Sequence, residues 1–205
     1  HLSIRRQRQM CIRDRRERRL PLRYGKPLAT SIEQHSGEGP LFDDDVRFVG
    51  EIFNLPDESL LPSLQSSTPE PTQAQLRTGA VVPDHDSLAS LKQLLGDAKV
   101  LTLLEAAGSL NEGLLFGLSL PQLAKGLDAP VLLAHAWDDA RSVEPLLQAK
   151  ALLGDHLVGV VFNNVVPEQL EDLRKELSPA LQGLGLPVYG PVSYTHLRAH
   201  ETSLH

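Results

Sequence analysis

The chain has 205 residues, with 20 basic and 26 acidic side chains and a formal net charge of −6. It has one Cys and no apolar run near the roughly 18 residues that a membrane-spanning helix needs. This composition argues against a disulfide framework, a thiolate metal cluster and a membrane-spanning protein. We therefore expect a soluble, cytoplasmic protein without a membrane partner.

The two ends of the chain differ in origin from the segment between them. One short DNA duplex can encode residues 10–14 on one strand and residues 192–196 on the other, as an inverted mosaic end of a transposase-made sequencing library would. We therefore interpret residues 1–15 and 191–205 as translated adapter sequence, which is not native. Without these flanks, the remaining segment has 14 basic and 24 acidic residues, a net charge of −10. This balance argues against sequence-independent nucleic-acid binding.

The first part of the central segment predicts one strand, one helix and a long connection. Residues 22–28 have the apolar pattern of a strand that ends at Gly25 and Pro27. A helix is predicted from about residue 43 to 53, because three consecutive aspartates open it and a helix N-terminus favours negative charge. Residues 54–88 contain five prolines and many Ser, Thr and Gln, which predicts an irregular connection with little more than a turn of helix.

The rest of the central segment alternates between short apolar runs and stretches of helical period. The apolar runs, predicted as buried parallel strands, are residues 100–104, 131–134, 157–162 and 186–189. The helical stretches are residues 118–127, 143–153 and 168–184. Such alternation predicts an α/β fold of three layers, with a mostly parallel, doubly wound sheet between two layers of helices. We expect residues 16–190 to belong to one domain.

Ligands of open parallel sheets bind at the C-terminal ends of the strands, so the residues that follow each apolar run are candidates for a site. In this chain they are Lys26, Glu105, residues 135–139, Asn163 and Asn164. We therefore expect four polar groups to converge on one edge of the sheet.

Each candidate also has a purely structural interpretation. Lys26 can be a solvated lysine at a strand end, and Asp45 can be a charge that any helix N-terminus favours. Asn163 and Asn164 can be turn residues that tolerate left-handed backbone geometry. A carboxylate such as Glu105 at the end of an apolar strand is costly unless it is solvated or used, which favours a ligand role.

Three further motifs are interpreted as structural. Asp139 fits a cap of the helix after it better than a partner for His135. Residues 84–86, Asp-His-Asp, are interpreted as a solvated loop rather than a metal cluster. The apolar residues 114–116 are expected in the core rather than on a partner surface.

Five short strings, in this order, resemble a known family: residues 24–28 (YGKPL), 44–48 (DDVRF), 103–108 (LLEAAG), 118–122 (LSLPQ) and 159–163 (GVVFN). Together they resemble the dethiobiotin synthetase-like branch of the P-loop nucleotide hydrolases, and more closely the N-terminal domain of phosphotransacetylase-like proteins. The resemblance covers nearly all of residues 16–190.

The resemblance implies a domain that binds ATP with Mg²⁺. Asp45 and Glu105 would bind the metal, Lys26 would face the phosphate or substrate side, and Asn163 would hydrogen-bond the adenine edge. It also implies a first strand and a glycine-rich loop ending in Gly-Lys-Ser/Thr, which the sequence lacks, so the fold is expected to be truncated there. Ala106 stands where the family usually has glycine. We therefore expect the chain itself to bind nucleotide poorly or not at all.

Three functions remain open at this point. The first is a regulatory or sensing module that binds nucleotide and is joined to further C-terminal domains in the parent protein. The second is an ATP-dependent carboxylase or ligase of the dethiobiotin synthetase type. The third is a docking domain that needs no nucleotide. Nucleotide is the expected partner, nucleic acid and membrane are not, and a homo-oligomer is left open.

Overall fold

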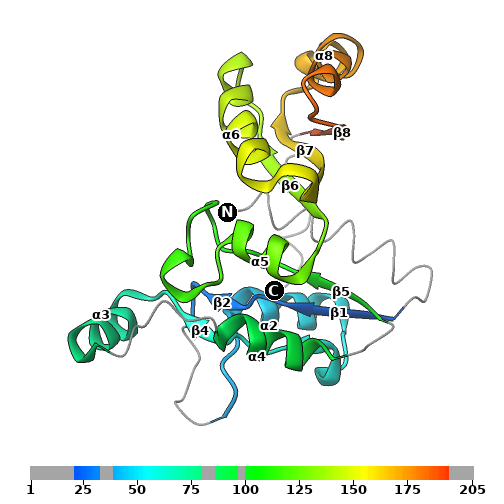
Figure 1. Cartoon of the computed structure of the whole chain (residues 1–205). Helices are drawn as coiled ribbons and strands as arrows, with labels where there is room; N and C mark the ends of the chain where they lie inside the picture. Colours follow the sequence, from blue (N-terminus) through cyan, green and yellow to red (C-terminus); the bar gives the residue numbers. More distant parts are fainter. Residues whose placement is uncertain (1–20, 33–38, 80–85, 97–99, 194–205) are drawn as a thin grey trace. The chain divides into compact units, whose positions relative to one another are not determined.

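A computed structural model describes residues 21–32, 39–79, 86–96 and 100–193. The protein is mixed α/β, with parallel strands arranged in small sheets (Figure 1). Its contacts divide into two units, which we call the N-terminal unit (within residues 8–129) and the C-terminal unit (within residues 130–205). Within the described ranges, every helix is too short or too polar to cross a bilayer.

The N-terminal unit contains two small parallel sheets. In the first, β1 (Leu22–Gly25) lies between β3 (Leu60–Leu61) and β5 (Leu101–Leu104). In the second, β2 (Leu28–Ala29) pairs with β4 (Gln65–Ser66). The predicted strand over 22–28 is therefore two strands, interrupted where Pro27 has no backbone N–H to donate to a neighbour.

The described residues of this unit include the helices α2 (Asp44–Phe53), α3 (Pro69–Thr78), α4 (Asp86–Leu95) and α5 (Leu120–Leu127). One-turn 3₁₀ helices lie at Asp57–Ser59 and Leu114–Phe116. The predicted helix over 43–53 is confirmed, with Asp43 as its N-cap.

The prediction of an irregular connection over 54–88 is wrong, because this segment contains β3, β4, α3 and the start of α4. The number of prolines favoured the irregular connection. Pro69 and Pro71 instead lie in the first turn of α3, where backbone N–H groups have no partner within the helix and their loss costs little.

Two apolar clusters lie on opposite faces of the β3-β1-β5 sheet. One is formed by residues of β1 and α2: Leu22, Tyr24, Val46, Val49 and Phe53. The other is formed mainly by residues of β2, α4, α5 and the segment before α5: Leu28, Leu91, Phe116, Leu118 and Leu123. Leu103 packs on the first cluster and Leu104 on the second. Because successive residues of a strand point to opposite faces, α2 covers one face and α4 and α5 cover the other.

The short 3₁₀ helix Leu114–Phe116 corrects one prediction. Phe116 is buried, as expected, but Leu114 is 59% exposed and Leu115 is 38% exposed. A 3₁₀ helix has three residues per turn, so three consecutive side chains point in three different directions. Only one of them can face the core.

The C-terminal unit contains one parallel sheet in the order β6 (Val131–Ala136), β7 (Leu157–Val165) and β8 (Val188–Ser193). α6 (Val143–Leu153) connects β6 to β7, with the bounds that the sequence predicts. One-turn 3₁₀ helices precede and follow it at Ala140–Ser142 and Gly154–His156. Parallel strands lie at the predicted runs 131–134 and 157–162 and extend further along the chain, whereas the strand predicted over 186–189 begins at Val188. The prediction that these strands are buried is wrong in part, since Leu132, Val158 and Tyr189 are 50%, 40% and 69% exposed.

The connection from β7 to β8 is helical but irregular. It comprises a 3₁₀ turn (Pro167–Gln169), α7 (Leu170–Asp172), a π turn (Leu173–Leu177) and α8 (Ser178–Gly183). Pro179 lies in the first turn of α8 and has no N–H to donate. The backbone oxygen of Leu173 accepts hydrogen bonds from both the backbone N–H and the hydroxyl of Ser178, the latter at 2.6 Å. The predicted helix over 168–184 is thus confirmed in extent but contains one wide turn.

β8 continues past residue 190, into the part interpreted as adapter sequence. Pro191 lies opposite Phe162, and Ser193 lies opposite Val165 on β7. Strand pairing uses backbone groups that almost any residue supplies. The pairing here therefore does not require a native sequence, and the assignment of residues 191–205 to the adapter stays an interpretation.

Candidate functional site

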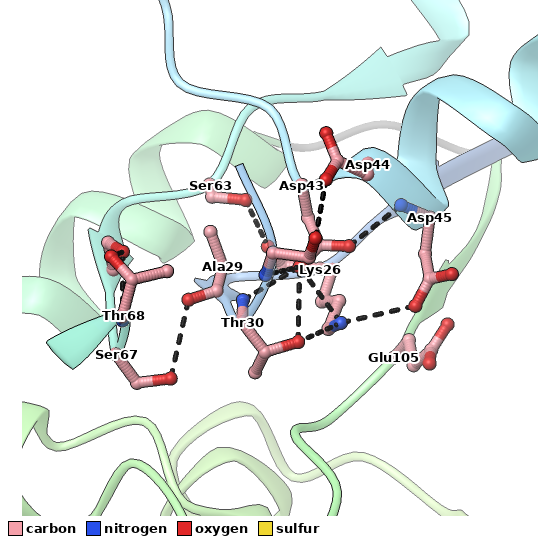
Figure 2. A network of polar contacts seen from close by, with 12 residues as sticks. Lys26, Ala29, Thr30, Asp43, Asp44, Asp45, Ser63, Ser67, Thr68 and Glu105 are labelled. Carbon is pink, nitrogen blue, oxygen red and sulfur yellow. Dashed lines mark hydrogen bonds and ion pairs between the residues drawn. The ribbon is translucent and has the colours of Figure 1, made fainter. Parts of the chain in front are cut away.

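Lys26 follows β1 directly, and its side chain is only 5% exposed. Its ammonium nitrogen lies 2.9 Å from Asp43 Oδ2 and 3.3 Å from Asp45 Oδ2. It also donates to Thr30 Oγ1 at 2.5 Å (Figure 2). The interpretation of Lys26 as a solvated lysine is therefore wrong, because the charge is buried and has two carboxylate partners.

Asp43 holds this network together. Its side chain is fully buried, and Oδ1 accepts a hydrogen bond from the backbone N–H of Asp45 at 2.8 Å, as an N-cap does. Oδ2 accepts from the backbone N–H groups of Thr30 and Ser31, at 2.7 and 3.2 Å. Three backbone donors and Lys26 therefore fix the carboxylate in place. The sequence predicts Asp43 at the start of this helix but gives no sign that it belongs to the site.

Asp45 is the second residue of α2, and its side chain is 16% exposed. This is more than Asp43, which is fully buried. Its first-turn position suits the interpretation as a helix N-terminal charge, and its carboxylate also faces Lys26 (Figure 2). The interpretation of Asp45 as a helix N-terminal charge therefore fits its position, and its role as a metal ligand stays a prediction.

Glu105 follows β5 and lies beside Lys26 across the two strands. Its backbone N–H donates to the backbone oxygen of Gly25 at 2.9 Å. The hydroxyl of the fully buried Tyr24 donates to Glu105 Oε2. Tyr24 and Lys26 point to the same face of β1 because they are two residues apart, and this is the face that α2 covers.

The structure thus brings three of the four predicted site residues to one place. Lys26 and Glu105 end neighbouring parallel strands, and α2 brings Asp45 to the same end. Tyr24, like Asp43, was not predicted, because its hydrogen bond joins residues 81 positions apart in sequence. In the sequence, Tyr24 and Lys26 only continue the alternation of a strand. Nothing in that pattern indicates that Tyr24 bonds to Glu105.

At this place, carboxylates lie next to the ammonium group of Lys26. Carboxylate oxygens are hard ligands that suit Mg²⁺. Across the described ranges, no three or more His, Cys, Asp or Glu side chains are grouped so that they could hold a metal ion by themselves. The predicted role of Asp45 and Glu105 as metal ligands therefore stays a prediction.

Asn163 belongs to the C-terminal unit, whereas Lys26, Asp45 and Glu105 belong to the N-terminal unit. Asn163 is 2% exposed, and its backbone oxygen accepts from the N–H of Trp137 at 2.8 Å. Its role toward adenine stays a prediction.

The neighbouring Asn164 has a φ of 57°. This is the left-handed geometry that asparagine tolerates better than most residues. The left-handed geometry expected of Asn164 is therefore confirmed, but the prediction of a turn is wrong, because Asn163 and Asn164 both lie within β7.

The capping interpretation of Asp139 is also confirmed. Its Oδ1 accepts from the N–H of Arg141 at 2.8 Å, at the start of the 3₁₀ helix Ala140–Ser142. Hydrogen bonds from the side chain of Arg141, and then from its backbone, lower the pKa of Asp139. Burial lowers the pKa of His135, and a hydrogen bond with the backbone of Ser142 partly opposes this shift. Asp139 is therefore engaged by Arg141.

Two further expectations concern residues outside this network. Asp84 and His85 lie outside the described residues, and Asp86 is the first residue of α4. Ala106, at the position where the resemblance expects glycine, packs against the cluster that contains Leu28 and Leu91. The Ala106 methyl group therefore contributes to apolar packing.

Comparisons with known proteins assign no family. No protein-family model matches the chain, and no curated protein matches it significantly. A function must therefore be argued from the geometry around Lys26 and from the five strings described above.

Proposed function

We propose that the chain is part of a domain that binds ATP together with Mg²⁺. One observation carries this proposal: Lys26, Asp45 and Glu105 gather at the C-terminal ends of two neighbouring parallel strands. This is the edge at which open α/β sheets bind their ligands. The five strings that resemble the dethiobiotin synthetase-like branch support the same assignment.

In this proposal each of the three residues has one role. Asp45 and Glu105 bind Mg²⁺, which neutralises charge on the phosphates when it is bound. Lys26 binds a phosphate oxygen. The hydrogen bond from Tyr24 orients the Glu105 carboxylate.

A regulatory or sensing module of a phosphotransacetylase-like protein accounts best for this set of residues. The side chains in the network supply charge and hydrogen bonds, which are the groups that a metal-bound triphosphate would contact in the parent domain. Within the described residues, the network consists of carboxylates, hydroxyls and a lysine and has no imidazole that could act as a base. We therefore favour a binding function over a catalytic one.

For the parent domain we propose a three-layer fold with a doubly wound, mostly parallel sheet. In the N-terminal unit, the packing of α2 against one face of the sheet and of α4 and α5 against the other supports this. In the C-terminal unit, the alternation of β6, α6, β7, α7–α8 and β8 supports it.

The first test measures binding of Mn²⁺, a probe for Mg²⁺, by isothermal titration calorimetry and electron paramagnetic resonance. We expect one site, and we expect Glu105→Gln to weaken binding roughly tenfold or more, since it removes a charged ligand. Glu51→Gln, on the exposed end of α2, removes the same charge away from the site and is the control. Equal Mn²⁺ affinity in the two variants would overturn the proposal.

Nucleotide binding separates the candidate functions. Because the sequence contains no Gly-Lys-Ser/Thr loop, we expect only weak ATP binding by this chain, and binding that requires Mg²⁺. ATP binding without phosphate release favours the sensing module. Phosphate release that depends on an added amine substrate would instead favour the carboxylase or ligase.

A further inference from the structure

The ammonium group of Lys26 lies where it would compete with a metal ion for Asp45. Resting on the proposed function, we propose that Lys26 is a built-in competing cation, which Mg²⁺ displaces from Asp45 so that the ammonium group turns toward phosphate. The site then accepts a triphosphate only together with its metal ion.

The two carboxylates that hold Lys26 differ in how firmly they are fixed. Asp43 is fully buried and accepts hydrogen bonds from three backbone N–H groups, those of Thr30, Ser31 and Asp45. Its contact with Lys26, at 2.9 Å, is also the shorter of the two ion pairs. Asp43 is therefore the permanent partner of the ammonium group.

Asp45 is the exchangeable partner. Its Oδ2 is 3.3 Å from Lys26 Nζ, and its side chain has 16% of its surface exposed. A hydrated cation can reach this carboxylate from solvent, which it cannot do at Asp43. Glu105, beside Lys26 on the next strand, adds a second carboxylate on the same face.

Binding of a divalent ion and the ammonium group to Asp45 at the same time would cost free energy. Two like charges a few ångströms apart repel strongly where water is largely excluded, and the Lys26 side chain is only 5% exposed. Once Mg²⁺ binds Asp45, Lys26 keeps Asp43 and Thr30 but loses its second ion pair. The freed ammonium group can then donate to an incoming phosphate oxygen.

This exchange also changes the group that a nucleotide meets. In the structure, the Lys26 ammonium group is paired with the carboxylates of Asp43 and Asp45. A metal-free triphosphate would meet an ammonium group that both carboxylates hold. Mg²⁺ releases it from Asp45, so metal and nucleotide bind cooperatively.

The test compares Mn²⁺ affinity in Lys26→Gln with that in Lys125→Gln, which removes the same charge from an exposed position on α5. Loss of the competing cation should lower the Kd of Lys26→Gln for Mn²⁺ roughly tenfold, whereas Lys125→Gln should bind as the wild type does. Equal or weaker binding by Lys26→Gln overturns this inference alone. No Mn²⁺ binding by any of the three proteins overturns the proposed function and this inference with it.

A measurement on the wild-type chain covers the case in which Lys26→Gln does not fold. The Lys26 ammonium resonance is recorded by ¹⁵N NMR of lysine-labelled protein and assigned by its loss in Lys26→Arg, which keeps the positive charge. We expect this resonance to shift as Mg²⁺ is added, with the same midpoint as Mg²⁺ binding measured by calorimetry. A resonance that does not move while Mg²⁺ binds overturns the exchange.

Discussion

Gly25 ends β1 immediately before Lys26, and its missing side chain sets how closely the strands approach. It lies opposite Leu61 on β3 and Leu104 on β5. A Cβ atom at this position would lie 2.6 Å from the Cβ of Leu61, which is shorter than any normal contact. The strand end that presents Lys26 therefore depends on glycine.

We predict that Gly25→Ala lowers the free energy of unfolding by about 1–3 kcal/mol, the usual cost of forcing extra volume into a packed site. Chemical denaturation measures this change. Gly108→Ala is the control, because its added methyl would meet only the flexible carboxylate end of Glu112, at 3.3 Å. Equal losses in the two variants would show that the approach of β1 to β3 does not depend on Gly25.

At the scale of the element, α2 links the core to the site. Its apolar face packs Val46, Val49 and Phe53 against β1. The same packing fixes its N-terminus, where Asp43 and Asp45 meet Lys26. A change at the N-cap therefore affects both the helix and the buried charge.

We predict that Asp43→Ala lowers the free energy of unfolding by about 3–5 kcal/mol, because it removes the helix cap and the main counterion of a buried ammonium group. Glu51→Ala, at the exposed end of the same helix, should change it by less than about 0.5 kcal/mol. Thermal or urea unfolding followed by circular dichroism measures both. A loss below about 1 kcal/mol in Asp43→Ala would contradict the role assigned to the network.

Elements with a strong local signal could be predicted from the sequence. Helix α6 has a regular apolar spacing, and three aspartates mark the start of α2. The bounds of both helices were therefore predicted within a residue or two. The helix α3 was missed because Pro69 and Pro71 suggest an irregular segment unless their first-turn position is known.

The site was predictable only in part, for a physical reason. The C-terminal ends of parallel strands share one edge, and this rule alone joins Lys26 to Glu105. The hydrogen bond of Tyr24 and the three backbone donors of Asp43 depend on side-chain orientation and on contacts distant in sequence. No local pattern encodes them.

At the scale of the whole molecule, the chain forms two units with separate contacts. In the C-terminal unit, α6 buries Leu146, Ala149 and Leu153, and the Trp137 ring meets Phe162 edge to face with centroids 4.9 Å apart. Each unit therefore has apolar packing of its own. Units of this kind can open separately.

We predict that Leu146→Ala destabilises the C-terminal unit by about 2–5 kcal/mol, the usual cost of a cavity left by a fully buried leucine. Amide hydrogen exchange should become faster in β6, β7 and β8 but not in β1 and β5. Leu147→Ala, at a 40% exposed neighbour on the same helix, should cost about 1 kcal/mol or less. Equal acceleration in both sheets would mean that the chain opens as one cooperative body.

The π turn between β7 and β8 gives that connection one residue more than a regular α-helix with the same packing would need. Leu173 and Leu181 are both buried although they are eight residues apart, a spacing that would rotate them about 80° from each other in a regular α-helix. The wide turn takes up one extra residue, so the pair is spaced as seven residues are, close to two whole turns. A version of this segment shorter by one residue could close the wide turn and keep both leucines in the core. Length variation among relatives should therefore concentrate at this turn.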